Sequence, residues 1–297
     1  IETWVKHQHT LMEAWGLNRK IKPGYRALFY GPPGTGRTVA AQALTEAAGW
    51  ACVIDGATDV GPVRIFSAAE SDAARYAEIF AAEIVAGPAD AREIPQAWFA
   101  RLLPRIRKAV EREVKIPLKD APLASYPTAA ATWVRVKNGK LEGATLGDSI
   151  AIVRTPAGQV SVFGEAGKPA DEQKRAVKVM AMTPEERLKW LQDVRAIHNT
   201  PNGYWVFGVQ PEAAAHIVYQ TTDAPAGTQV LVMTDGFYRL VSPYGRYTDE
   251  QLIDEAVARG LGELMRELRS LEESPEDDAK IGRFKTSDDA TALLLEV

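Results

Sequence analysis

The chain has 297 residues, of which 46% are hydrophobic and 25% are charged, and its formal net charge is −4 at pH 7. This composition is ordinary for a globular protein, and the acidic balance lacks the basic excess of nucleic-acid-binding domains. No stretch approaches the roughly 20 consecutive apolar residues of a membrane helix. The single cysteine, Cys52, excludes an internal disulfide and suits a reducing compartment. We therefore expect a cytoplasmic protein with no nucleic-acid partner and no membrane partner.

The first 47 residues contain a predicted strand, a glycine-rich loop and a helix, in that order. The strand covers residues 25–30, the loop reads Gly-Pro-Pro-Gly-Thr-Gly-Arg-Thr over residues 31–38, and a helical pattern follows to residue 47. Backbone N–H groups of such a loop and of the helix after it can bind a phosphate group. The candidate phosphate-binding residues are Gly34, Thr35, Gly36, Arg37 and Thr38.

Residues 24–38 resemble the Walker A region of AAA-type ATPases. The resemblance implies a bound nucleotide, with ATP as the candidate cofactor. Two features depart from that family. Arg37 stands where the family has a lysine, and a planar guanidinium is not equivalent to a compact ammonium group. No apolar run of the sequence ends in Asp-Glu, as a Walker B segment would, and the resemblance ends near residue 47.

Three predicted strands later in the chain each carry a carboxylate at one end. Asp55 and Gly56 end one apolar run, Asp235 ends a second, and Asp288 precedes a third. If these strand ends converge, they form a site of oxygen ligands, which hard divalent ions such as Mg²⁺ and Mn²⁺ prefer. An Asp-Gly pair is also a common turn signal, so a simple turn is the alternative for each of them alone.

Helices and strands alternate in blocks along the rest of the chain. Helices are predicted over residues 67–85, with Ser67 as the capping residue, and over 92–114, where Pro104 would break or kink the helix. Asn138-Gly139 joins two short apolar runs and predicts a hairpin. We expect this hairpin to continue as a meander of four strands, at residues 131–136, 141–146, 150–154 and 159–163. The remaining predicted elements are a helix start at residue 183, a strand entry at 201–208, a strand at 229–234, a helix over 249–272 and a strand at 292–295.

Four short motifs stand in a fixed order along the chain. They are Val53-Ile54-Asp55-Gly56, Leu146-Gly147-Asp148-Ser149, Met233-Thr234-Asp235-Gly236 and Asp288-Asp289-Ala290-Thr291. Their order and spacing resemble the metal-dependent Ser/Thr protein phosphatases of the PPM type, also called the 2C class, from about residue 49 to the last residue. The resemblance implies an α+β fold, an αββα sandwich of two antiparallel sheets flanked by helices, here preceded by the P-loop segment.

The same resemblance implies a metal site and a reaction. Asp55 would bridge two Mg²⁺ or Mn²⁺ ions and the Gly56 carbonyl would bind one of them. Asp235 and Asp288 would complete the pair, and Asp148 would contribute to a third, weaker site. The implied activity is hydrolysis of phosphoserine and phosphothreonine in a phosphoprotein substrate by a metal-activated water. No residue is assigned as a general acid or as a nucleophile.

The chain departs from the phosphatase pattern in two places. The arginine and the acidic segment that the family carries upstream of the first aspartate have no clear counterpart before Asp55. Arg239 stands four residues after Asp235, where a further acid is common. The basic side chains that could approach a phosphate are Arg195, Arg239, Arg246 and Arg283.

We predict two domains, an AAA-like P-loop fragment over residues 1–47 and a phosphatase-like domain over residues 48–297. Three functions stay open at this point. The favoured one is a metal-dependent protein phosphatase, and the alternatives are a P-loop protein that binds or hydrolyses ATP and a non-catalytic pseudophosphatase. His198 and His216 fit no metal-ligand spacing and are expected at the surface.

Overall fold

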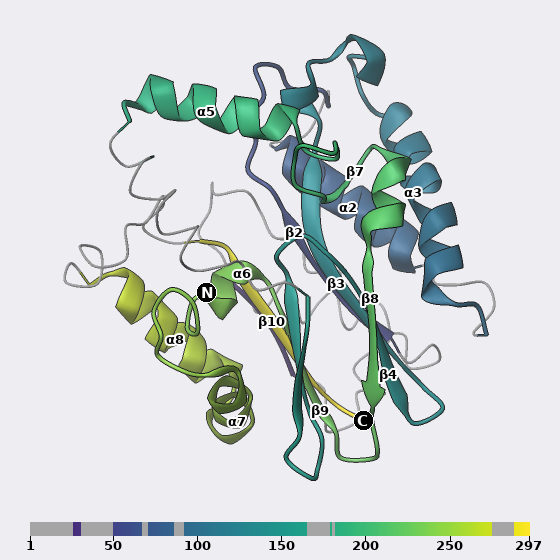
Figure 1. The fold of residues 1–297 in the computed structure, drawn as a ribbon. Helices are drawn as coiled ribbons and strands as arrows, with labels where there is room; N and C mark the ends of the chain where they lie inside the picture. The colour runs from purple at the N-terminus through teal and green to yellow at the C-terminus, as the bar shows by residue number, and fades with distance from the viewer. Residues whose placement is uncertain are drawn as a thin grey trace, which may run out of the picture.

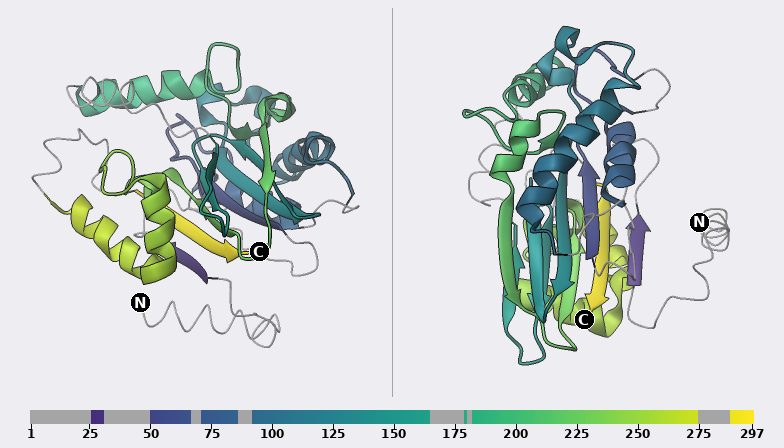
Figure 2. Two further views of the ribbon diagram at one scale, coloured as in Figure 1. Left: turned by 60° about the horizontal axis from the view of Figure 1, so that its bottom comes forward. Right: turned by 90° about the vertical axis from the view of Figure 1, so that its right-hand side faces the viewer.

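The computed structural model describes residues 26–30, 50–66, 71–85, 92–164, 179, 182–274 and 288–297. Two antiparallel sheets lie face to face, and helices cover the outer face of each sheet (Figure 1 and Figure 2). The predicted α+β fold with two antiparallel sheets and flanking helices is therefore confirmed. The glycine loop at residues 31–38 lies outside the described residues.

The two sheets are built from strands that are far apart in the chain. The first sheet has the order β1-β10-β9-β5-β6. Its strands are β1 (Arg26–Tyr30), β5 (Ile150–Arg154), β6 (Val160–Phe163), β9 (Gln229–Met233) and β10 (Ala290–Glu296). The second sheet has the order β2-β3-β4-β8, and the short β7 pairs with β3. Its strands are β2 (Trp50–Gly56), β3 (Thr128–Lys137), β4 (Lys140–Leu146), β7 (Phe207–Gly208) and β8 (Val218–Asp223).

Helices occupy both outer layers. The described helices are α2 (Asp72–Val85), α3 (Pro95–Glu111), α5 (Pro184–Ala196), α6 (Asp235–Tyr238), α7 (Asp249–Arg259) and α8 (Leu261–Glu272). Short 3₁₀ turns cover Leu118–Asp120, Leu123–Ser125 and Pro211–His216. None of the helices in the described part of the chain combines the length and the apolar character needed to cross a membrane.

The continuous apolar run of β2 follows from its place between two layers. Along this strand, Trp50, Cys52 and Ile54 pack toward α2 and α3, whereas Ala51 and Val53 pack toward the other sheet. A strand that is covered on both faces needs apolar side chains at every position. The same pattern recurs in β9, whose alternate side chains face the helices and the opposite sheet.

The core consequently has three parts. A central cluster fills the space between the sheets, and one outer cluster lies between each sheet and its helices. The outer cluster under α2 and α3 is aromatic. Phe99 lies at its centre, with ring centroids 4.7 Å from Trp98, 5.9 Å from Phe207 and 6.0 Å from Trp133. These contacts hold α3 against the β2-β3-β4-β8 sheet.

The hairpin prediction is confirmed, but the four-strand meander is wrong. Asn138 and Gly139 both have positive φ, 52° and 71°, as the tight turn between β3 and β4 requires. The next two strands, β5 and β6, pair with each other in the opposite sheet. Alternating polarity identifies which side chains are buried, but both sheets bury the same kind of side chain, so the pattern does not assign a strand to a sheet.

Three helix predictions need correction in detail. The stretch 249–272 is two helices, because Gly260 adopts a φ of 82° between α7 and α8. The helix α3 runs through Pro104 without a break in the helix. Ser67 lies outside the described residues, and the described α2 begins at Asp72, where the Ser71 hydroxyl accepts a hydrogen bond from the Ala74 amide at 3.2 Å.

The strand β1 belongs to the sandwich. It pairs antiparallel with β10 at the edge of the first sheet, with Arg26 opposite Leu294 and Tyr30 opposite Ala290. β1 covers one edge of β10, whose other edge pairs with β9. An uncovered edge would expose unpaired backbone groups, so β1 completes the hydrogen bonding of β10.

We predict that Phe99→Ala lowers the free energy of unfolding by about 3–5 kcal/mol, the usual loss for a large aromatic side chain removed from a core. The measurement is urea denaturation followed by tryptophan fluorescence. The control is Leu188→Ala on α5, where the side chain is 48% exposed and the expected change is within about 0.5 kcal/mol. A loss for Phe99→Ala no larger than that of the control would contradict the placement of this aromatic cluster.

Candidate functional site

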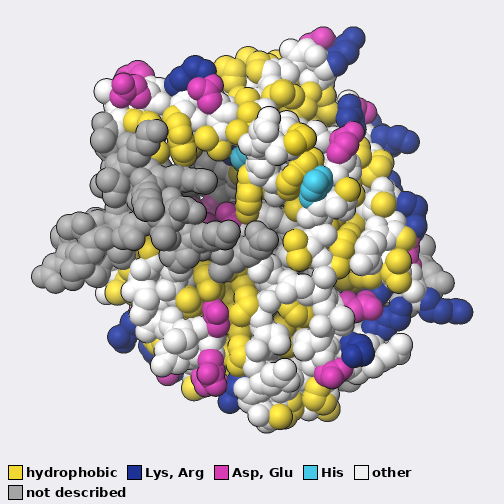
Figure 3. Space-filling view, in the orientation of Figure 1, with side chains coloured by type: hydrophobic (Ala, Val, Ile, Leu, Met, Phe, Trp, Pro, Cys, Tyr) yellow, Lys and Arg dark blue, Asp and Glu magenta, His cyan; other side chains and the backbone are white. Residues whose placement is uncertain are grey.

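A cavity of about 300 Å³ is lined by residues at strand ends of both sheets. Figure 3 shows acidic side chains inside a hollow on the face drawn in Figure 1. The predicted residues from all four motifs line this cavity, together with one acid that the sequence did not single out. They are Asp55, Gly56, Asp148, Asp235, Asp288 and Asp289.

Asp55 and Asp148 reach the cavity from the β2-β3-β4-β8 sheet. Asp55 lies one residue before the end of β2, opposite Ala130 of β3. Asp148 lies in the short connection that crosses from β4 to β5. Gly147 starts this connection with a φ of 93°, and a Cβ there would lie 2.5 Å from the Cβ of Ala130. Glycine is therefore required for the turn that brings Asp148 beside Asp55.

Asp235 and Asp288 reach the cavity from the other sheet. Asp235 begins the short helix α6 directly after β9, and Asp288 lies just before β10. The Thr234 amide donates to the Thr291 carbonyl at 3.0 Å, and the Thr291 amide donates to the Thr234 hydroxyl at 3.1 Å. A Cβ at Gly236 would overlap the backbone oxygen of Asp289, so only glycine permits this approach of the two segments.

The electrostatics of the cavity are dominated by buried negative charge. Burial raises the pKa of Asp55 above its usual value, and the nearby charges of Asp148, Asp288 and Asp289 raise it further. Burial, followed by the charges of Asp148, Asp55 and Asp288, likewise raises the pKa of Asp235. The carboxyl groups of Asp55 and Asp235 are direct neighbours in this cavity. Only a proton or a cation can relieve this repulsion while the backbone holds its place.

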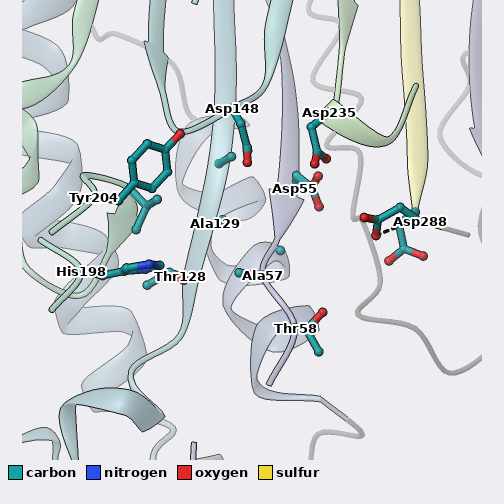
Figure 4. A pocket seen from close by; sticks show the side chains of 14 residues that line it. Asp55, Ala57, Thr58, Thr128, Ala129, Asp148, His198, Tyr204, Asp235 and Asp288 are labelled. Atoms are coloured by element: carbon teal, nitrogen blue, oxygen red, sulfur yellow. Dashed lines mark hydrogen bonds between the residues drawn. The ribbon is translucent and has the colours of Figure 1, made fainter. Parts of the chain in front are cut away.

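The side chains around the cavity are spread over its walls. In Figure 4, Asp55, Asp148 and Asp235 point toward one another, whereas Asp288 lies to one side. Within the described ranges, no group of three or more His, Cys, Asp or Glu side chains is arranged to hold one ion by itself. Mg²⁺ characteristically keeps several waters and takes only one or two protein carboxylates, so the chemistry of this donor set fits such an ion without a closed cage.

The opposite wall of the cavity carries residues that the sequence did not predict. His198, Tyr204 and Val206 line it, together with Thr128 and Ala129 of β3. The expectation that His198 lies at the surface is wrong, because this side chain is only partly exposed and lines the cavity. Burial, and then the charge of Arg195, lower the pKa of His198 to about 4.

The loop that carries His198 is held by a side-chain contact across the loop itself. Asn199 adopts a φ of 56°, and its side chain accepts from the Val206 amide at 2.8 Å. No local sequence motif predicts this arrangement. The other histidine, His216, is exposed as expected and stacks on Trp205 with ring centroids 3.4 Å apart.

The four arginines that could approach a phosphate differ in their contacts. Arg195 donates to the carbonyl of Thr58, a residue that lines the cavity, at 3.1 Å. Arg239 and Arg246 form ion pairs with glutamates of α8. Arg283 lies outside the described residues.

Comparison with protein families identifies one match. The model of the family described as "Protein phosphatase 2C" matches residues 39–273. The match begins before residue 47, where the sequence suggested a domain boundary, and that boundary stays a prediction. Neither this match nor the described structure supports a nucleotide site at the glycine loop. Comparison with curated proteins gives no match.

Solved structures of bacterial phosphatases share the fold. PppA, described as a key regulatory component of T6SS in Pseudomonas aeruginosa, is 16% identical, with a TM-score of 0.50, over 92% of this chain and 98% of that chain. The serine/threonine phosphatase PstP/Ppp of Mycobacterium tuberculosis is 14% identical, with a TM-score of 0.52, over 92% and 97%. The S. agalactiae serine/threonine phosphatase is 14% identical, with a TM-score of 0.51, over 92% and 98%. At these identities the likeness concerns the fold.

We predict that the metal-free protein loses stability as the pH rises. The folded-state pKa values of Asp55 and Asp235 lie above the ordinary value of about 4. At a pH between the unfolded-state pKa and the folded-state pKa, the folded state therefore binds more protons than the unfolded state. The stability is then greatest below the unfolded-state pKa and falls as the pH rises through the folded-state pKa, by at most about 1.4 kcal/mol per pH unit for each proton.

The measurement is the free energy of unfolding in urea with a chelator, from about pH 5 to about pH 8. Asp55→Asn should flatten this dependence, because an amide does not titrate. Asp223→Asn, at a side chain that is 80% exposed, is the control and should leave the dependence unchanged. A metal-free protein that became more stable over this range would contradict the electrostatic description of the cavity.

Proposed function

The chain belongs to the protein phosphatase 2C family of Ser/Thr phosphatases, and we propose that the acidic cavity is where it hydrolyses phosphoserine and phosphothreonine in protein substrates. One observation carries this proposal. Carboxylates from four separate chain segments line one cavity, although their mutual repulsion opposes the arrangement. A fold that holds such an unfavourable cluster in place is explained if the cluster binds cations.

We propose two divalent cations, Mg²⁺ or Mn²⁺, as the ions that neutralise this cavity. Hard cations of this kind select oxygen ligands, and the cavity offers carboxylates and backbone carbonyls. The residues proposed to hold them are Asp55, the carbonyl of Gly56, Asp148, Asp235 and Asp288. When bound, two such ions supply an activated water for attack on phosphorus and neutralise the charge of the phosphoryl oxygens.

The positions of the acids suggest different roles for them. Asp55 points toward both Asp148 and Asp235 in Figure 4, and it would hold cations together with them. Asp148 enters from the connection between the sheets, and Asp288 lies to one side in Figure 4. The acids are therefore spread over the cavity rather than gathered at one point.

The wall opposite the acids would receive the substrate. His198 and Tyr204 contact each other edge to face, with ring centroids 6.2 Å apart, and stand across the cavity from Asp55. Small side chains, those of Ala57, Ala129 and Ala130, leave the space between the two walls open. A phosphorylated side chain entering there would have acids and their cations on one side and an aromatic surface on the other.

We predict that the purified chain hydrolyses p-nitrophenyl phosphate and phosphothreonine peptides only when Mn²⁺ or Mg²⁺ is present. Asp235→Asn removes a proposed ligand charge, and we expect turnover to fall by more than the roughly 10–100-fold typical of outer-shell changes at metal sites. The measurement is the initial rate with and without Mn²⁺. Asp223→Asn, which removes an exposed carboxylate paired with Lys140, is the matched control.

The outcomes separate the alternative functions. Mn²⁺-dependent turnover that is lost in Asp235→Asn supports the phosphatase. Mn²⁺ binding without turnover of any phosphorylated substrate would identify a non-catalytic member of the family. Full turnover in Asp235→Asn would show that the reaction takes place elsewhere.

A further inference from the structure

Glu272 is a carboxylate at a core position of α8. The buried side chains of this helix fall at residues 261, 264, 265, 268 and 272, which is one face of the helix. The first four are Leu261, Leu264, Met265 and Leu268. The fifth is Glu272, which is only 1% exposed. A glutamate almost never lies fully buried unless it is paired, so its partners indicate why it is there.

Glu272 contacts two segments that are distant in sequence and one residue of its own helix. It accepts from the Arg239 guanidinium at 2.8 Å, from the Arg269 guanidinium and from the Asp288 backbone amide at 3.4 Å. Arg239 lies one helical turn after Asp235, and its backbone amide donates to the Asp235 carbonyl at 3.0 Å. A single carboxylate thus connects the segment that begins at Asp235 with the residue that leads into β10.

We propose that Glu272 is a positioning residue for the metal cavity, acting with Arg239 to fix the Asp235 and Asp288 segments relative to each other. This inference rests on the proposed metal-dependent function. Glu272 does not line the cavity, so it acts through the backbone of residues that do. Its two guanidinium partners compensate its burial and restrict its orientation.

Repulsion in the cavity is the reason that such a connection matters. Asp235 and Asp288 are both acidic and line the same cavity, so their negative charges repel each other. Segments that carry them would separate if nothing joined them. The hydrogen bond between Thr234 and Thr291 joins the end of β9 to β10. Glu272 joins the segments that lie beyond these strand ends, because it also contacts the Asp288 amide.

The test compares Mn²⁺ affinity, measured by titration calorimetry, and the Mn²⁺-induced rise in the thermal unfolding midpoint. Arg239→Gln is the decisive variant, because two explanations predict opposite signs. If Arg239 acted only through its positive charge, its removal would strengthen cation binding. If it positions Asp235, its removal weakens Mn²⁺ binding by about 10–100-fold. Glu272 stays paired with Arg269 in this variant, which favours a folded protein.

Glu272→Gln is the second variant and should weaken Mn²⁺ binding to a similar extent. The matched control is Glu267→Gln on the same helix. Glu267 accepts from Arg246 at 2.6 Å and pairs with Arg259 at 2.9 Å, and it contacts none of the residues that line the cavity in the described structure. Glu267→Gln removes the same charge from the same helix as Glu272→Gln. This control should bind Mn²⁺ within about twofold of the parent chain, as expected for a change away from the site.

Weakened Mn²⁺ binding in Arg239→Gln and Glu272→Gln, with an unchanged control, supports the positioning role. Unchanged or stronger binding in Arg239→Gln overturns it, as does an equal loss in the control. A parent chain that binds Mn²⁺ while both variants match it overturns the positioning role alone. A parent chain that binds no Mn²⁺ overturns the proposed function, and the positioning role with it.

Discussion

Repulsion among buried carboxylates is the constraint on which the rest of this structure depends. The carboxyl groups of Asp55 and Asp235 are direct neighbours, with Asp148, Asp288 and Asp289 around them. Moving such groups out of water is unfavourable because they lose hydration, and moving them toward one another is unfavourable because their like charges repel. The free energy that opposes this repulsion comes from the apolar clusters on both faces of each sheet. The site is therefore a region of low intrinsic stability inside a well-packed scaffold.

The scaffold restricts how this repulsion can be relieved. Asp55 belongs to a strand that is paired along its whole length with β3. The Asp235 and Asp288 segments are joined by two hydrogen bonds between Thr234 and Thr291, one between backbone groups and one from the Thr291 amide to the Thr234 hydroxyl. The acids cannot move apart without breaking strand pairing. Relief must come from a positive charge, and burial together with the neighbouring acids raises the pKa of both Asp55 and Asp235. The repulsion among the carboxylates that destabilises the cavity thus favours cation binding, as expected for sites with strongly perturbed acids.

The sequence predicts the acids well and their surroundings poorly. An apolar run with an acid at one end locates Asp55 and Asp235, which follow their runs, and Asp288, which precedes its run, because a strand covered on both faces leaves polar residues only at its ends. His198 has no such signal, since the segment before it is held by contacts with distant residues, from Arg195 to the Thr58 carbonyl and from Gln192 to the Val60 carbonyl.

The same distinction holds for the fold. The tight turn at Asn138-Gly139 is a local property and is predicted correctly. The assignment of β5 and β6 to the opposite sheet depends on long-range pairing with β9, which local patterns do not contain. The strand β8 escapes prediction because its sequence, Val-Tyr-Gln-Thr-Thr-Asp, is largely polar, as is common for a partly exposed strand at the edge of a sheet.

The helix α8 shows how packing and function are coupled in this fold. Its apolar face, which includes Leu264 and Leu268, packs on the outer side of the first sheet, and this burial fixes the helix axis relative to β9 and β10. Glu272 continues the same face by one more turn and reaches the entrance of β10. Because the same face sets both the packing and the position of Glu272, a change in helix packing is transmitted to the backbone of Asp288. The packing of the apolar core and the geometry of the acidic cavity are consequently coupled.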